Sequence, residues 1–278
     1  MVERSAFVTG ASSGIGRATV ERLAADGYRV VAGVRREGDA PAAASACVLL
    51  DLAEPESITP ACKEVLAHTD GRLDALVNNA GININGPFET LPLEEWRRQF
   101  EVNLFGQLAV TRELLPAVLA SKGRIITVGS VGGRISAPFL GPYSASKFAV
   151  RAWMDSLRHE LWSHGIKVVL IEPGAIRTAI WGKGNAHADT VLDALTGEQK
   201  ERYAAQAAAA RKIAAYAERR AIAPEKVAAV IARALTDGQP RGRYLVGVDA
   251  RLQALVAAAP TRTADRIVRM AMGRAPRR

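Results

Sequence analysis

The chain has 278 residues, 49% of them hydrophobic and 23% charged, which is enough to bury one substantial α/β core. No apolar run approaches the ~20 residues of a membrane-spanning helix, and the first residues leave no room for a signal peptide, so we expect a soluble, cytoplasmic protein. Its two cysteines lack metal or redox spacing, which fits a reducing compartment and predicts no bound metal. Residues 241–278 hold nine arginines and two aspartates and so carry most of the net charge of +9.

Residues 5–9 are apolar and predict a buried strand, which leads into Thr9-Gly-Ala-Ser-Ser-Gly-Ile-Gly16 and a helical stretch at 17–26. Glycines permit a tight turn, and the N-terminus of the following helix offers amides and a positive dipole to a pyrophosphate. The glycines could serve the turn alone, and their GxxxGxG spacing differs from the general GxGxxG fingerprint. The strand before and the helix after favour a phosphate-binding loop.

A second strand is predicted at 29–34, about twenty residues beyond the glycine turn. An acidic side chain at such a strand end would bind the ribose hydroxyls of NAD. Here Val34 and Arg35 occupy this place. A guanidinium suits the 2′-phosphate of NADP, so Arg35 favours that coenzyme. The alternative is a solvated basic turn.

Further apolar runs predict strands, several of them ending in small polar or acidic residues, at 46–51, 73–81, 124–130, 166–171 and 243–248. Helical stretches of ten or more residues separate them. This alternation predicts an α/β fold, a Rossmann-like doubly wound parallel sheet of about seven strands, in one domain over residues 1–248. Ligands bind such sheets at the carboxyl ends of the strands.

A long helix is predicted at 94–120, with Asn103 and Gly106 in its middle. Both residue types are unfavourable inside a helix. Asn103 could hydrogen-bond a water or bend the helix, whereas a buried core polar residue is the ordinary interpretation.

Tyr143 and Lys147 lie four residues apart on a predicted helix over 143–164, which Gly165 ends, so both project from one face. A nearby ammonium would lower the pKa of the tyrosine towards neutrality. Ser130 ends the preceding strand and could hold a carbonyl or alcohol oxygen beside the tyrosine. Taken alone, the Tyr–Lys spacing would fit a surface pair.

Residues 179–220 read as an Ala-rich insertion, in which Thr196 and Gln199 predict a capping box. Two short helical stretches at 249–259 and 263–273 lie in a basic extension, 249–278. Cationic amphipathic helices can lie on an anionic membrane. We favour the alternative that the extension packs over the insertion or a neighbouring subunit with its arginines in water.

Taken together, the motifs resemble the short-chain dehydrogenase/reductase family. The resemblance covers roughly residues 5–180, with a looser match onward to 248. It rests on motifs in family order: Thr9-Gly10-xxx-Gly14-x-Gly16, Asn78-Asn79-Ala80-Gly81, Asn103, Ser130, Tyr143-xxx-Lys147 and Pro173-Gly174.

The resemblance implies an NAD(P)-dependent oxidoreductase acting on a CH–OH group, with Tyr143 as general acid/base. Lys147 would lower the tyrosine pKa and bind the nicotinamide ribose, Ser130 would orient the substrate oxygen, and Asn103 would hold a water in the proton relay. The implied cofactor-binding residues are Gly10, Ser12, Ser13, Gly14, Ile15, Gly16, Arg35, Asp51, Leu52, Asn79, Ala80, Gly81, Tyr143, Lys147, Pro173, Gly174, Ile176 and Thr178. Among these, Asp51 and Leu52 would meet the adenine, and Pro173 to Thr178 the nicotinamide. Some NADP-using members carry a basic residue where this chain has Ser13.

A narrower resemblance connects Asp155-Ser-Leu-Arg-His-Glu-Leu and the stretches around 165–178 and 249–265 with the retinol/hydroxysteroid dehydrogenase branch. It implies a bulky apolar alcohol, ketone or aldehyde as substrate, and the family implies a homodimer or homotetramer. We expect NADP as coenzyme, with NAD as the alternative. A non-catalytic dinucleotide-binding sensor is the alternative of another class, and no nucleic-acid partner is expected because no recognisable binding motif is present.

Overall fold

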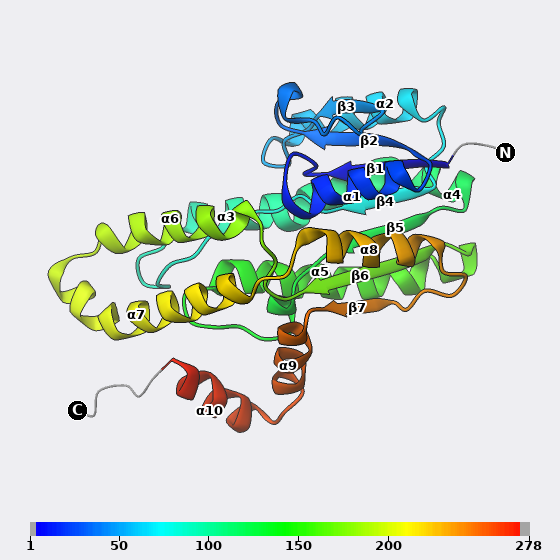
Figure 1. The fold of residues 1–278 in the computed structure, drawn as a ribbon. Helices are drawn as coiled ribbons and strands as arrows, with labels where there is room; N and C mark the ends of the chain where they lie inside the picture. Colours follow the sequence, from blue (N-terminus) through cyan, green and yellow to red (C-terminus); the bar gives the residue numbers. More distant parts are fainter. Residues whose placement is uncertain (1–3, 273–278) are drawn as a thin grey trace.

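The computed structural model describes residues 4–272, except for the side chains of residues 181, 183, 185 and 186. Seven parallel strands form one sheet in the order β3-β2-β1-β4-β5-β6-β7, so the predicted doubly wound architecture is confirmed (Figure 1). The strands are β1 (Arg4–Thr9), β2 (Tyr28–Val34), β3 (Ala46–Leu49), β4 (Ala75–Asn78), β5 (Arg124–Val128), β6 (Lys167–Pro173) and β7 (Arg243–Val246).

The strand order reverses between β1 and β4, which are hydrogen-bonded neighbours with Phe7 opposite Leu76. Doubly wound sheets bind dinucleotides in the crevice at such a switch point, outside the carboxyl ends of the strands. The glycine turn follows β1, and the Asn-Asn-Ala-Gly motif follows β4. The topology therefore brings these two motifs to the same place.

Helices cover both faces of the sheet, which is why the strands read as continuous apolar runs. On one face α1 (Gly14–Ala25) packs with α8 (Pro224–Thr236) over Ala6 and Val8. On the other, α2 (Ile58–His68), α4 (Gly106–Ser121) and α5 (Gly141–Glu160) pack over Phe7. Successive residues of β1 thus belong to two separate hydrophobic cores, as the two-residue period of a strand requires.

The long helix predicted at 94–120 is interrupted in the middle, where Asn103 lies. It consists of α3 (Leu93–Phe100), a π-helical turn at Glu101–Phe105 and α4. Gly106 begins α4 in close contact with Leu52. A Cβ added at this position would stand only 2.7 Å from the Leu52 Cβ, so glycine is needed there. The two residues that are unfavourable in a helix interior thus mark the irregular turn.

The insertion forms α6 (Ala179–Asp193) and α7 (Gly197–Arg220), which extend away from the sheet (Figure 1). The predicted capping box of Thr196 and Gln199 is present at the start of α7. Glu89, in the loop before α3, accepts hydrogen bonds from Arg202 and from the Tyr203 hydroxyl, each at 2.8 Å. This carboxylate therefore fastens α7 to the loop.

The C-terminal extension forms α9 (Val248–Ala257) and α10 (Thr261–Ala271), close to the predicted 249–259 and 263–273. α9 packs against β7 and the 3₁₀ turn Val131–Gly133, and α10 packs against α9. Among the residues that the structure describes, no helix is long and apolar enough to cross a membrane.

Candidate active site

The glycine turn after β1 has the shape of an anion-binding loop. Gly10 (φ +64°) and Gly14 (φ +54°) adopt left-handed backbone conformations that favour glycine. A Cβ at Gly16 would collide with the carbonyl oxygen of Gly10, so the helix starts in close contact with the turn. Ser13 is the N-cap of α1, yet its side chain makes no capping hydrogen bond. These residues fit a dinucleotide, whose pyrophosphate would lie at the first amides of α1.

Asn79 locks the turn onto the end of β4. Its side-chain amide donates to the carbonyls of Thr9 (3.0 Å) and Gly10 (3.1 Å). The Thr9 hydroxyl accepts in return from the backbone amides of Asn79 and Ala80. The side chain of Asn79 therefore holds the loop, and any contact with an adenosine ribose would come from the neighbouring backbone.

The residues expected around the adenosine stand at the ends of β2 and β3. Arg35 is exposed, and its guanidinium makes no ion pair with any acidic side chain that the structure describes. Asp51 accepts a hydrogen bond from the Ala53 amide (3.0 Å), which fixes the turn after β3. The Leu52 side chain is buried in the core, so only its backbone can face an adenine.

Ser130, Tyr143 and Lys147 meet at the carboxyl end of β5. The Ser130 hydroxyl accepts from the Gly132 amide (3.0 Å) and hydrogen-bonds the tyrosine side chain. The ammonium of Lys147 is buried, donates to the Val128 carbonyl (3.1 Å) and lies 5.9 Å from the centre of the Tyr143 ring. A hydroxyl pair beside a buried lysine can hold an oxygen atom and exchange a proton with it.

The electrostatics of this group differ from the sequence-based expectation that Lys147 lowers the pKa of Tyr143. Burial raises the pKa of the half-buried Tyr143, and the hydrogen bond with Ser130 offsets part of that rise. Burial also lowers the pKa of Lys147 to about 8. Desolvation is therefore the largest cause of the pKa shift in both side chains, and Lys147 titrates at about pH 8.

The depressed pKa of Lys147 predicts a pH-dependent stability of the cofactor-free protein. Between the folded value of about 8 and the reference value of 10.5, the unfolded chain binds more protons, so stability rises with pH. We expect the free energy of unfolding to gain about 2 kcal/mol from this group between about pH 7 and pH 9.5. Urea unfolding should show that Lys147→Met lacks this rise and that the exposed control Lys63→Met keeps it. Equal slopes for Lys147→Met and wild type would contradict the assignment.

Asn103 fixes the loop segment that follows β4. Its Oδ1 accepts from the Ile82 amide (2.8 Å), and its Nδ2 donates to the Ile82 carbonyl (3.1 Å) and the Ser146 hydroxyl (3.2 Å). Both amide hydrogens are thereby engaged. Only acceptor atoms of Asn103 remain available for the water expected in a proton relay.

Two buried glutamines also hold the backbone of residues 80–84, and sequence reasoning missed them. Gln99 accepts from the Ile84 amide (2.7 Å) and donates to the Ile82 carbonyl, while Gln107 donates to the Ala80 carbonyl (2.6 Å). Positions 99, 103 and 107 are four residues apart, so the repeat of an amide side chain at this helical spacing could have revealed them.

The loop that carries Ser130 is fixed by a buried ion pair that the sequence did not reveal. Arg134 donates two hydrogen bonds, of 2.7 and 2.5 Å, to the carboxylate of Glu172 on β6. Glu172 is fully buried, and Arg134 is 19% exposed. Because Arg134 follows the turn Val131–Gly133, the pair holds the serine loop against the end of the sheet.

The residues expected at the nicotinamide end lie beyond β6. Thr178 is the N-cap of α6, and its methyl group would stand 2.8 Å from a Cβ added at Gly14. Ile176 is buried and pairs with Ile222, whereas Gly174 leaves room for the carboxylate of Asp249. Residues 174–178 thus pack against the glycine turn on the side where the insertion begins.

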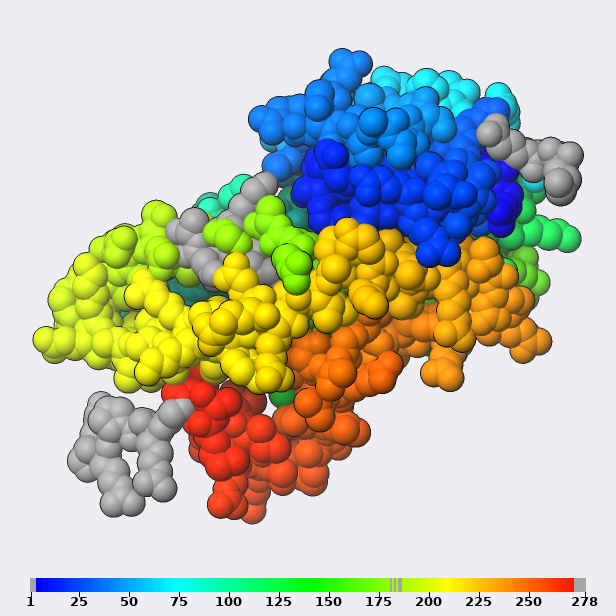
Figure 2. Space-filling model, in the orientation of Figure 1, coloured from blue at the N-terminus to red at the C-terminus, as the bar shows by residue number. Residues whose placement is uncertain are grey.

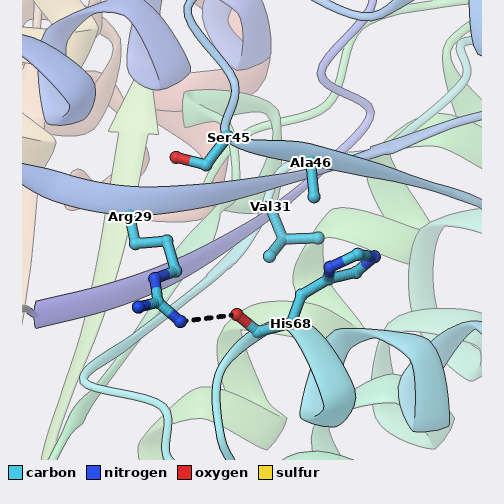
Figure 3. A pocket seen from close by; sticks show the side chains of 5 residues that line it. All are labelled: Arg29, Val31, Ser45, Ala46 and His68. Atoms are coloured by element: carbon cyan, nitrogen blue, oxygen red, sulfur yellow. Dashed lines mark hydrogen bonds between the residues drawn. The ribbon is translucent and has the colours of Figure 1, made fainter.

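A separate hollow lies at the amino ends of the strands, away from Ser130, Tyr143 and Lys147. It is lined by Arg29, Val31, Ser45, Ala46 and His68, at the amino ends of β2 and β3 (Figure 3). Arg29 donates to the His68 carbonyl (3.2 Å) and pairs with Asp70 (3.0 Å).

Comparison with known proteins bears on this site. The family model described as short chain dehydrogenase matches residues 4–189. The chain is 45% identical over 182 residues to the uncharacterized oxidoreductase YbbO of Escherichia coli, covering 64% of this chain and 68% of YbbO. It is 41% identical to an NADPH-dependent 3-dehydrocapnine reductase of Ornithobacterium rhinotracheale (67% and 72% covered) and 34% identical to retinol dehydrogenase 16 of Mus musculus (90% and 82%).

Solved structures agree with these relatives. A short-chain dehydrogenase from Streptomyces avermitilis superimposes with a TM-score of 0.74 at 33% identity, over 92% of both chains. One from Burkholderia cenocepacia, in complex with NADP, gives 0.74 at 26% identity over 96% and 97%.

The fold and the glycine turn define a dinucleotide-dependent oxidoreductase. The chain belongs to the short-chain dehydrogenase/reductase family, with resemblance to its retinol/hydroxysteroid dehydrogenase branch, and it is an NAD(P)-dependent enzyme.

Proposed function

We propose that the protein is an NADP(H)-dependent oxidoreductase that interconverts a bulky apolar alcohol with its ketone or aldehyde, using Tyr143 as general acid/base. The observation that carries the proposal is the meeting of Ser130, Tyr143 and buried Lys147 beside the glycine turn. A sensor that only bound the dinucleotide would have no use for this proton-transferring group.

The residues divide the reaction between them. The bound coenzyme supplies or accepts the hydride. In the reductive direction, the Ser130 hydroxyl holds the substrate oxygen and the Tyr143 hydroxyl donates its proton to that oxygen. Lys147 places a charge next to the tyrosine as the phenolate forms, which favours proton release. Asn103 and the two buried glutamines keep the segment at 80–84 in place behind the lysine.

The coenzyme preference is proposed to rest on Arg35, since Ser13 supplies no charge. We expect NADPH to be favoured over NADH by about 1.5–3 kcal/mol, roughly ten- to a hundredfold in kcat/KM. The pair Val34→Asp with Arg35→Ala should reverse the preference, because a carboxylate would then face the ribose hydroxyls. Arg36→Ala is the matched control, since its guanidinium is already paired with Asp39 at 2.9 Å. Equal use of both coenzymes by the wild type would refute the role of Arg35.

The insertion and one of the relatives support the proposed substrate class. Helices α6 and α7 extend next to the end of β6, with many alanines and a fixed attachment through Glu89. One relative is a retinol dehydrogenase, and retinol is a bulky apolar alcohol. A panel of apolar ketones and aldehydes assayed by NADPH absorbance tests the proposal. Turnover of small polar carbonyls in preference to apolar ones would refute the substrate class, and no turnover at all would favour a sensor.

Assembly into a homodimer or homotetramer is also proposed, with contacts along α3 and α5. On these helices Phe100, Trp153 and Leu157 pack against the chain's own core, whereas Phe148 is exposed. The exposed Phe105 adds to this surface, in a groove shared with Trp96. Light scattering should give at least twice the chain mass of 29.6 kDa at micromolar concentration. A mass near one chain would contradict the assembly.

A cytoplasmic location is proposed because Cys47 and Cys62 are both free thiols, as a reducing compartment would keep them. No nucleic-acid partner is proposed.

A further inference from the structure

The C-terminal hairpin, formed by α9 and α10, presents an uncovered apolar stripe. Val248, Leu252 and Leu255 follow one another at i, i+4 and i+7 along α9, so they share one face of the helix. Their exposed fractions are 71%, 58% and 70%. Side chains of this type are ordinarily turned inward in a helix that packs on its own protein.

The second helix of the hairpin is amphipathic and equally uncovered. Ile267 and Met270 are exposed, and no residue of α10 is buried. By helical spacing, Arg262, Arg266 and Arg269 occupy the face opposite Ile267 and Val268. The space-filling view shows the hairpin projecting from the body of the molecule (Figure 2).

The hairpin is a fixed part of the fold. The carboxylate of Asp249 accepts a hydrogen bond from the Ala175 amide (2.6 Å), and Ala250 is fully buried. α9 also packs against β7 and the turn Val131–Gly133 beside the active site. The apolar stripe is therefore held in place at the rim of the active site, because the helix that carries it is anchored to the sheet.

Charge identifies what covers this surface. Residues 249–278 hold seven arginines and two aspartates, and the carboxylate of Asp249 is engaged with the backbone. Across a two-fold contact, a second copy would bring the same positive surface against itself. An anionic lipid surface accepts both features, because apolar side chains enter its interface while arginines remain at the headgroups.

We propose that the C-terminal hairpin docks the protein on anionic membrane surfaces. Leu252, Leu255 and Ile267 enter the lipid interface, and Arg266 and Arg269 contact the lipid headgroups. The docking is independent of the proposed substrate, since it depends on the hairpin alone. The exposure of the stripe argues against packing over the insertion, and the test below separates membrane docking from contact with a neighbouring subunit.

Co-sedimentation of the full chain with vesicles tests the proposal. At physiological salt, the protein should pellet with vesicles of equal parts phosphatidylglycerol and phosphatidylcholine and stay in solution with pure phosphatidylcholine. Leu252→Ser with Leu255→Ser, and separately Arg266→Gln with Arg269→Gln, should each weaken binding at least about fivefold. All four side chains are exposed, so the fold and the reductase activity should be retained.

The matched controls remove an exposed leucine, or two exposed positive charges, from surfaces outside the hairpin. Leu49→Ser deletes an exposed leucine on β3, and Lys63→Gln with Arg112→Gln deletes two exposed charges on α2 and α4. Both controls should bind vesicles within about twofold of wild type. Failure of the wild type to pellet overturns the proposal. It is equally overturned if the leucine variant lowers the mass in light scattering, which would make the stripe an interface between copies.

Discussion

Replacing Tyr143 by phenylalanine is expected to lower kcat by about 10²–10⁴-fold, the usual contribution of a general acid/base. The variant lacks one oxygen atom, so the ring next to Lys147 and the packing around it are kept. NADPH affinity, measured by fluorescence, should therefore stay near that of wild type. A loss of rate without a loss of coenzyme affinity separates proton transfer from binding.

Tyr28→Phe provides the control for that experiment. The Tyr28 hydroxyl accepts a hydrogen bond from Arg4 (3.1 Å), at the amino end of β2 and away from Ser130. Its removal should leave kcat unchanged. If Tyr143→Phe retained more than about a tenth of the wild-type kcat, another group would have to carry the proton.

Arg134→Ala should cost the protein about 3–5 kcal/mol of unfolding free energy, because it leaves the carboxylate of Glu172 buried and unpaired. Urea denaturation measures the change. The exposed pair of Arg22 and Asp26, at 2.9 Å, gives the comparison, and Arg22→Ala should cost no more than about 1 kcal/mol.

A second variant distinguishes the ion pair from simple loss of packing. Arg134→Met with Glu172→Leu removes both charges and keeps the volume, so most of the lost stability should return. Equal costs for Arg134→Ala and Arg22→Ala would show that the buried pair adds no stability. The double variant should also show whether kcat depends on the pair, since the loop it holds carries Ser130.

The sheet and the grouping of Ser130, Tyr143 and Lys147 at the end of a strand could be predicted because local sequence determines them. Strands buried on both faces are apolar throughout, so β1 and β6 are visible as runs. Glycine is favoured where the backbone turns left-handed, as at Gly10 and Gly14. The ends of strands were less accurate. β4 stops at Asn78, short of the predicted residue 81, because Asn79 and Ala80 turn to bond the Thr9 hydroxyl.

What could not be predicted depends on residues that are distant in the sequence. Arg134 and Glu172 are 38 positions apart, and Arg243 and Asp155 are 88 apart, yet each pair forms a bidentate ion pair in the fold. The expected fall in the pKa of Tyr143 left out burial, which raises that pKa, for the same reason. Spacing on a helix gives the distance to Lys147 but not the burial that both side chains experience.

The π-helical turn at Glu101–Phe105 constrains the number of residues between α3 and α4. Such a turn holds one residue more than an α-helical turn, and each residue rotates an α-helix by about 100°. Deleting a residue there would restore a regular helix but turn Asn103 away from Ile82, or Gly106 away from Leu52. When related sequences are aligned, a one-residue gap inside this helix would therefore indicate a chain whose active site has been rebuilt or abandoned, although gaps in loops are commonly neutral.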